Sequence, residues 1–170
     1  LYHTSLETQK RLCYHGDMKN LDLFEQFLKE SRNIVFFGGA GVSTESGIPD
    51  FRTEDGLYRQ KFRFPPEYML SHECFERNPE EFFAFYREKM LATGAKPNPA
   101  HRKLAEWERE GRLNAVVTQN IDGLHQAAGS RNVFELHGSV HRNHCMRCGK
   151  SFPLAFVAES KGVPRCACGG

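Results

Sequence analysis

Four of the six cysteines form two close pairs, and cysteine pairs at such spacing bind metal. Cys145 and Cys148 are separated by two residues, Cys166 and Cys168 by one, and seventeen residues lie between the pairs. Two such pairs can hold opposite edges of a tetrahedron, as in a structural zinc site with four cysteine ligands. The alternatives are disulfides and unrelated buried thiols, but the sequence shows no secretory features that would favour disulfides. We therefore predict Zn²⁺ in a closed site that supports structure and leaves no open position for catalysis.

Polar side chains follow two short apolar runs that we interpret as strands. Asn120 and Asp122 come after residues 115–118, and His137 comes after residues 133–136. The carboxyl ends of parallel strands meet at one edge of a sheet, where ligands bind. A histidine there can act as a general base, although a lone histidine is more often structural. Asp122 has an alternative role as the cap of a following helix.

A glycine-rich loop follows a third apolar run, residues 34–37. Gly39 and Gly41 match the first two glycines of the dinucleotide-binding fingerprint, but Thr44 stands where the third is expected. Small residues let the backbone approach a pyrophosphate, and N–H groups at the start of the next helix can point at the anion. Such loops also serve simply as turns, so both interpretations stay open here.

Helices are expected between these strands. Apolar spacing predicts one over residues 21–29, and Asn78 as N-cap with Pro79 in the first helical position predicts another that runs to Met90. A third is expected over residues 98–110, and the polar, aromatic stretch after Arg52 through Pro66 reads as a loop. Strands separated by helices indicate right-handed crossovers and a parallel sheet.

The expected fold class is therefore α/β: an incomplete Rossmann-like parallel sheet with helices, plus a small zinc-ribbon subdomain held by the four paired cysteines. We place the Rossmann-like part at residues 1–137, with a helical and loop insertion at about 53–95, and the zinc subdomain at residues 138–170. Cys13 and Cys74 lack partners in the sequence and are interpreted as ordinary thiols.

Composition excludes several classes of protein. The 170 residues are 26% charged and 39% hydrophobic, which is ordinary for a globular chain. A net charge of +2 does not argue for nucleic-acid binding, and no apolar run approaches the roughly 18 residues of a membrane span. We expect a soluble, cytoplasmic monomer that binds neither nucleic acid nor membrane.

These motifs together resemble the sirtuins, the Sir2 family of NAD-dependent protein lysine deacylases. Four segments carry the resemblance, in the family's order: residues 39–52, residues 118–125, residues 137–139 and the cysteine pairs. The family implies catalysis by His137 and Asn120 with NAD as co-substrate and an acetyl-lysine protein or peptide as partner. The products would be free lysine, nicotinamide and O-acetyl-ADP-ribose.

The resemblance also implies roles for the residues around NAD. Phe51 and Arg52 would lie over the nicotinamide ribose, which Gln119 would also contact, while Ile121 and Asp122 would hold the carboxamide of nicotinamide. The phosphate side would be lined by three residues of the glycine loop: Ala40, Gly41 and Thr44.

Two further expectations concern activity. Sirtuins that prefer succinyl-lysine resemble one another in carrying Tyr and, three positions later, Arg. Here Lys89 stands three positions after Tyr86. We therefore expect the substrate to carry an uncharged acyl group, most readily acetyl.

The family continues beyond the second cysteine pair, so we expect a C-terminally truncated sirtuin with weak or no activity by itself. Alternatives are a protein ADP-ribosyltransferase of the same fold and an inactive zinc-ribbon interaction module.

Overall fold

A computed structural model describes residues 19–50, 64–91 and 94–170. Contacts divide the chain into two units, residues 1–34 and 35–170. The first unit contains helix α2 (Lys19–Glu30), which confirms the helix predicted over 21–29. Phe51, Arg52 and Cys13, together with most of the predicted loop, lie outside the described residues.

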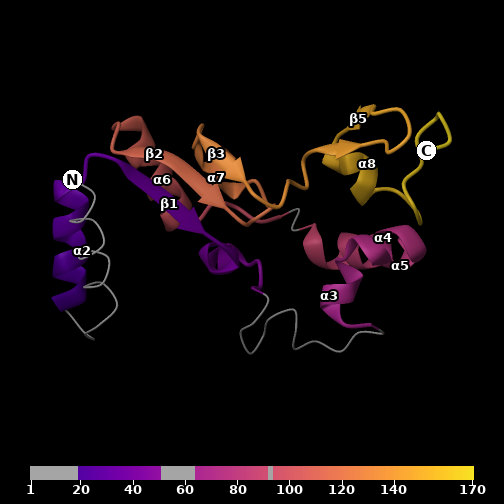
Figure 1. Ribbon diagram of the computed structural model, residues 1–170, viewed down its shortest axis with the longest axis horizontal. Helices are drawn as coiled ribbons and strands as arrows, with labels where there is room; N and C mark the ends of the chain where they lie inside the picture. The colour runs from indigo at the N-terminus through magenta and orange to yellow at the C-terminus, as the bar shows by residue number, and fades with distance from the viewer. Residues whose placement is uncertain (1–18, 51–63, 92–93) are drawn as a thin grey trace, which may run out of the picture. The chain divides into compact units, whose positions relative to one another are not determined.

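Three strands form the sheet in the order β1, β2, β3 (Figure 1). They are β1 (Ile34–Gly38), β2 (Leu113–Thr118) and β3 (Val133–Glu135), which confirms the three predicted strands to within two residues at each end. Strands β2 and β3 are parallel. The Gln119 N–H donates to the Gly38 carbonyl at 3.0 Å, so the end of β2 is fixed beside the end of β1.

Helices α6 (Pro99–Arg109) and α7 (Leu124–Ala128) pack against each other, and α6 packs against β2. Asn98 begins α6 with a complete capping box, since its side chain accepts from two backbone N–H groups and His101 Nδ1 accepts from the Asn98 N–H. Buried apolar side chains fill the space between these elements: Leu104, Ala105, Val116 and Leu124. The prediction of a helix from Asn98 to the glycine at 111 is confirmed.

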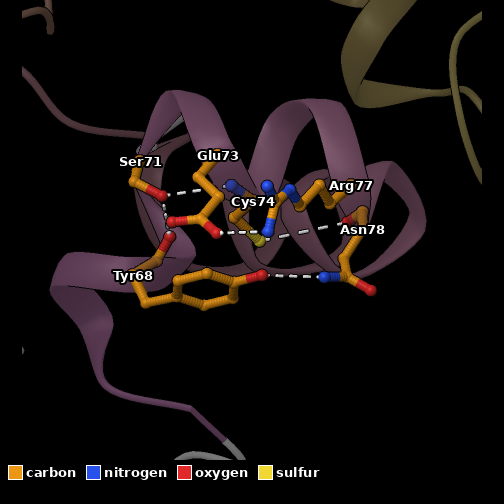
Figure 2. Close-up of polar contacts among 6 residues, drawn as sticks. All are labelled: Tyr68, Ser71, Glu73, Cys74, Arg77 and Asn78. Carbon is orange, nitrogen blue, oxygen red and sulfur yellow. Dashed lines mark hydrogen bonds and ion pairs between the residues drawn. The ribbon is translucent and has the colours of Figure 1, made fainter.

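A group of short helices follows the undescribed segment: α3 (Pro66–Met69), α4 (His72–Arg77), α5 (Pro79–Phe85) and a π-helical turn η3 (Tyr86–Met90). Figure 2 shows how α4 begins: the Ser71 hydroxyl accepts from the Cys74 N–H at 3.1 Å and donates to the Tyr68 carbonyl at 2.7 Å. Helices α3 and α4 were not predicted, because elements of four and six residues are too short to show helical periodicity.

The predicted N-cap at Asn78 is correct in position but wrong in its chemistry. Pro79 occupies the first helical position, yet the Asn78 side chain caps no N–H group. Its amide instead donates to the Tyr68 hydroxyl at 2.7 Å (Figure 2). A tertiary hydrogen-bond partner has therefore replaced the local one.

The last part of the chain contains a two-stranded ribbon and one helix. Strand β4 (Asn143–His144) pairs antiparallel with β5 (Ser151–Phe152), and α8 (Leu154–Ala158) follows. The rings of Phe152 and Phe156 stack with centroids 4.1 Å apart. Within the part of the chain that is described, no helix has the length and apolar character needed to cross a membrane.

Candidate functional site

The ends of the three strands converge on a cavity of about 360 Å³. Six of the predicted site residues line it: Ala40, Gln119, Asn120, Ile121, Asp122 and His137. The helical group supplies another part of the wall, including Tyr86 and Lys89. Gly41 and Thr44 are not part of this lining, and the positions of Phe51 and Arg52 are not described.

The glycine loop folds into a short 3₁₀ helix, η1 (Ala40–Ser46), instead of the start of a longer helix. Gly47 ends it with φ = 82°, a left-handed conformation that favours glycine. The Thr44 hydroxyl donates to the Gly41 carbonyl at 3.0 Å, so this side chain stabilises the turn itself. The phosphate role of Gly41 and Thr44 stays a prediction.

Ser43 joins the glycine loop to the end of β2, and the sequence assigned it no role. Its side chain is 1% exposed, donates to Asp122 Oδ2 at 2.6 Å and accepts from Asn120 Nδ2 at 3.0 Å. Asp122 Oδ1 also accepts from the Leu124 N–H at 2.9 Å. The N-cap of α7 is Gly123, however, so the alternative role of Asp122 as the cap residue is wrong by one position. No pattern in the sequence indicates a partner 79 positions away.

His137 is held in one tautomer by a backbone carbonyl. Its Nδ1 lies 3.0 Å from the Gln119 oxygen, and a carbonyl can only accept, so Nδ1 carries the proton. Within the described residues no hydrogen bond involves Nε2 of this ring, which leaves its lone pair able to accept a proton. The arrangement suits a general base.

Two buried histidines lie behind the site and were not singled out from the sequence. The rings of His101 and His125 are 4.7 Å apart, and both residues are at most 1% exposed. Burial lowers the pKa of His101, and burial with the nearby His101 lowers the pKa of His125 to about 4. Both imidazoles are therefore neutral near pH 7.

The four predicted zinc ligands form one cluster, in which all Sγ atoms lie within 4.8 Å of one another. The Cys145–Cys168 and Cys148–Cys166 separations are 3.5 and 3.7 Å. A tetrahedron with Zn–S bonds of about 2.3 Å has edges of about 3.8 Å, so the thiols fit the ion. Backbone N–H groups of Cys148 and Arg147 lower the pKa of Cys145 to about 6, which favours its thiolate form.

The model of the Sir2 family matches residues 39–169. The chain belongs to the Sir2 family. Among its relatives, the NAD-dependent protein deacetylase of Clostridium acetobutylicum is 59% identical over 157 residues, covering 90% of this chain and 64% of that protein. The NAD-dependent protein deacetylase of Cutibacterium acnes is 58% identical over 146 residues, covering 85% and 60%. The chain spans about three fifths of the length of these curated relatives.

Solved Sir2 structures share the fold. One contains a deacetylated p53 peptide and 3′-O-acetyl ADP-ribose, with a TM-score of 0.80 and 42% identity over 88% of this chain and 61% of that one. Another is a complex of Sir2 with a p53 peptide and NAD⁺, with a TM-score of 0.72 and 44% identity over 86% and 58%. The Sir2 resemblance and the α/β fold class with its cysteine cluster are confirmed.

Proposed function

We propose that this chain forms the nicotinamide and ribose side of an NAD-dependent protein lysine deacetylase. The main support is the cavity at the strand ends, which His137 lines together with Asn120 and Asp122. The Gln119 carbonyl fixes the tautomer of His137, as a general base requires. The relatives' names and the Sir2 complexes with peptide, NAD⁺ and acetyl ADP-ribose support the same chemistry. NAD would supply the ADP-ribose that accepts the acetyl group.

We propose that one residue of the cavity transfers a proton and that the others bind or position the co-substrate. His137 would accept a proton from a ribose hydroxyl through Nε2, because Nδ1 is already engaged. Asn120 would bind close to the reacting ribose with Gln119, and Ser43 holds the Asn120 amide in place. Ile121 and Asp122 would hold the carboxamide of nicotinamide.

The remaining roles are proposals from the resemblance. Ala40, Gly41 and Thr44 would face the phosphates of NAD, and Phe51 and Arg52 would cover the ribose.

The cysteine cluster would hold one structural Zn²⁺, and a reducing compartment such as the cytoplasm suits four free thiolates. We expect a monomer, which sedimentation velocity would test. A dimer in that experiment would contradict this expectation, and its interface would be sought at the exposed side chains of Val35, Phe37 and Phe134.

The acyl group is proposed to be acetyl. Tyr86 and Lys89 both line the cavity, and Lys89 also pairs with Glu88 at 2.9 Å. A lysine lacks the bidentate fork with which arginine grips a carboxylate, so a charged acyl group gains less here. Faster turnover of a succinyl-lysine peptide than of the matching acetyl-lysine peptide would contradict the proposal.

The central test has a binding step and a turnover step. The polypeptide is first titrated with nicotinamide and with NAD by ligand-observed NMR, and binding of both is expected. It is then incubated with NAD and an acetyl-lysine peptide, and the products are identified by mass. O-acetyl-ADP-ribose supports the proposal, ADP-ribosylated protein supports the transferase alternative, and absence of all binding leaves only the zinc-ribbon module.

Turnover by the 170-residue chain alone is expected to be weak or absent, since the chain spans about three fifths of the relatives' length. His137→Ala should abolish the remaining product while nicotinamide binding persists, because the imidazole transfers the proton and does not hold the carboxamide. Turnover at rates ordinary for deacetylases would show that this expectation of weak activity is wrong.

A further inference from the structure

The segment that leads from β3 into the zinc ribbon runs beside the loop that follows β2. Three groups of residues 137–141 hydrogen-bond three carbonyls of residues 119–122. His137 Nδ1 lies 3.0 Å from the Gln119 oxygen, and the Val140 N–H donates to the Ile121 oxygen at 3.0 Å. His141 Nε2 lies 3.3 Å from the Asp122 oxygen. Because a carbonyl only accepts, the His141 ring must donate from Nε2.

His141 also packs directly over the next residue. A Cβ atom added to Gly123 would lie 2.7 Å from both Cδ2 and Nε2 of the His141 ring, and Gly123 has φ = 72°. The left-handed backbone favours glycine at this position, and any larger residue would force the His141 ring to shift. The peptide between residues 122 and 123 is thus held by donation to its carbonyl and by contact with the ring.

Flanking residues fix the His141 backbone from both sides. Val140 is 4% exposed, so the residue before His141 is anchored in the interior. The Arg142 guanidinium pairs with Glu135, whose side chain is only 3% exposed, so the residue after it is tied to the end of β3. The histidine is therefore presented to Asp122 by anchored neighbours.

Asp122 is the residue that this arrangement positions. Its two carboxylate oxygens accept from Ser43 and from the Leu124 N–H, which leaves the main chain to be fixed by another group. We propose that His141 is a positioning residue, which orients Asp122 in the nicotinamide-binding wall by holding the 122–123 peptide. This inference rests on the proposed function, because Asp122 lines the proposed nicotinamide cavity and His141 would act on it from outside the lining.

The test compares three substitutions of His141 in the 170-residue chain. His141→Gln retains a side-chain N–H donor, His141→Phe retains a ring without a donor, and His141→Ala removes both. The His141→Phe and His141→Ala variants should bind nicotinamide about three- to tenfold more weakly than the unaltered chain, because one hydrogen bond is lost. The His141→Gln variant should bind within about twofold of the unaltered chain. His72→Ala, which removes an exposed histidine from α4, is the control and should bind as the unaltered chain does.

A second readout is independent of nicotinamide. The backbone ¹⁵N shift of Gly123 reports donation to the Asp122 carbonyl, so it should change in the Phe and Ala variants and stay near its original value in the Gln variant. Unaltered binding in the Phe variant, or equal weakening in Phe and Gln, would overturn the inference. If the unaltered chain binds no nicotinamide, the proposed function fails, and an unchanged Gly123 shift in the Phe variant would then reject the contact itself.

Discussion

The buried imidazole of His125 makes folding stability depend on pH. Its pKa of about 4 in the folded chain is below the ordinary value of 6.5, chiefly because of burial and His101; Asp122 and Glu135 oppose the shift only partly. The unfolded chain therefore binds a proton that the folded chain does not between these two pH values. The contribution of the neutral His125 to the free energy of unfolding is fully present above about pH 6.5. It is lost as the pH drops toward about 4, by about 1–3 kcal/mol.

Urea unfolding at about pH 7.5 and about pH 5, on either side of the ordinary histidine pKa, measures this loss. His125→Phe removes the titrating group and should reduce the difference between the two pH values, whatever it does to stability at the higher pH. His72→Ala, an exposed histidine, should leave the difference as it is. An equal pH dependence in the His125→Phe variant would show that other groups carry it.

At the scale of elements, Asn98 connects α6 to the glycine loop. Its side chain caps α6 through the Ala100 and His101 N–H groups, and its amide donates to the Val42 carbonyl at 2.7 Å. Asn98→Ala removes both functions at a residue that is only 5% exposed, so it should cost about 2–4 kcal/mol of unfolding free energy.

The matched comparison is Asn98→Asp, which retains the cap oxygen but loses the amide donor. Asn98→Asp should lower the unfolding free energy less than Asn98→Ala does, because α6 keeps its cap. Both variants should shift the NMR amide signals of residues 40–46 in η1 to the same degree, because both lose the hydrogen bond to Val42. Equal stability of Asn98→Ala and the unaltered chain in urea unfolding would refute the role of this cap.

At the scale of the whole molecule, the cysteine cluster should make the ribbon depend on metal. A two-stranded ribbon of two residues per strand has too little core to fold alone, so Zn²⁺ binding should supply its stability. We expect one Zn²⁺ per chain, and chelation should remove the β4–β5 signals while those of β2 and α6 persist.

Metal content by a colorimetric zinc assay and amide NMR before and after chelation check this. Cys166→Ser should abolish stoichiometric zinc, whereas Cys74→Ala, at a buried thiol outside the cluster, should leave the content at one. A ribbon that is unchanged after complete zinc removal would contradict the prediction.

Local patterns in the sequence were enough to predict much of this protein. Apolar spacing located α2, short apolar runs located the three strands, and the spacing of the cysteines located the zinc cluster, because each of these depends on residues close together in the chain. Their positions after predicted strands pointed to His137, Asn120 and Asp122 before the Sir2 resemblance gave them roles, and the strand ends do bring these residues to one cavity. Their individual roles stay predictions.

Only the tertiary structure shows which groups from distant parts of the chain hydrogen-bond to one another. Ser43 meets Asp122 across 79 positions, and Asn78 leaves its expected cap for Tyr68. The His141 ring reaches the Asp122 carbonyl, although 19 positions separate the two residues. Local propensity is a property of neighbouring residues, whereas such contacts arise when folding brings remote backbone and side-chain groups within hydrogen-bonding distance, and a single sequence carries no direct signal of that distance.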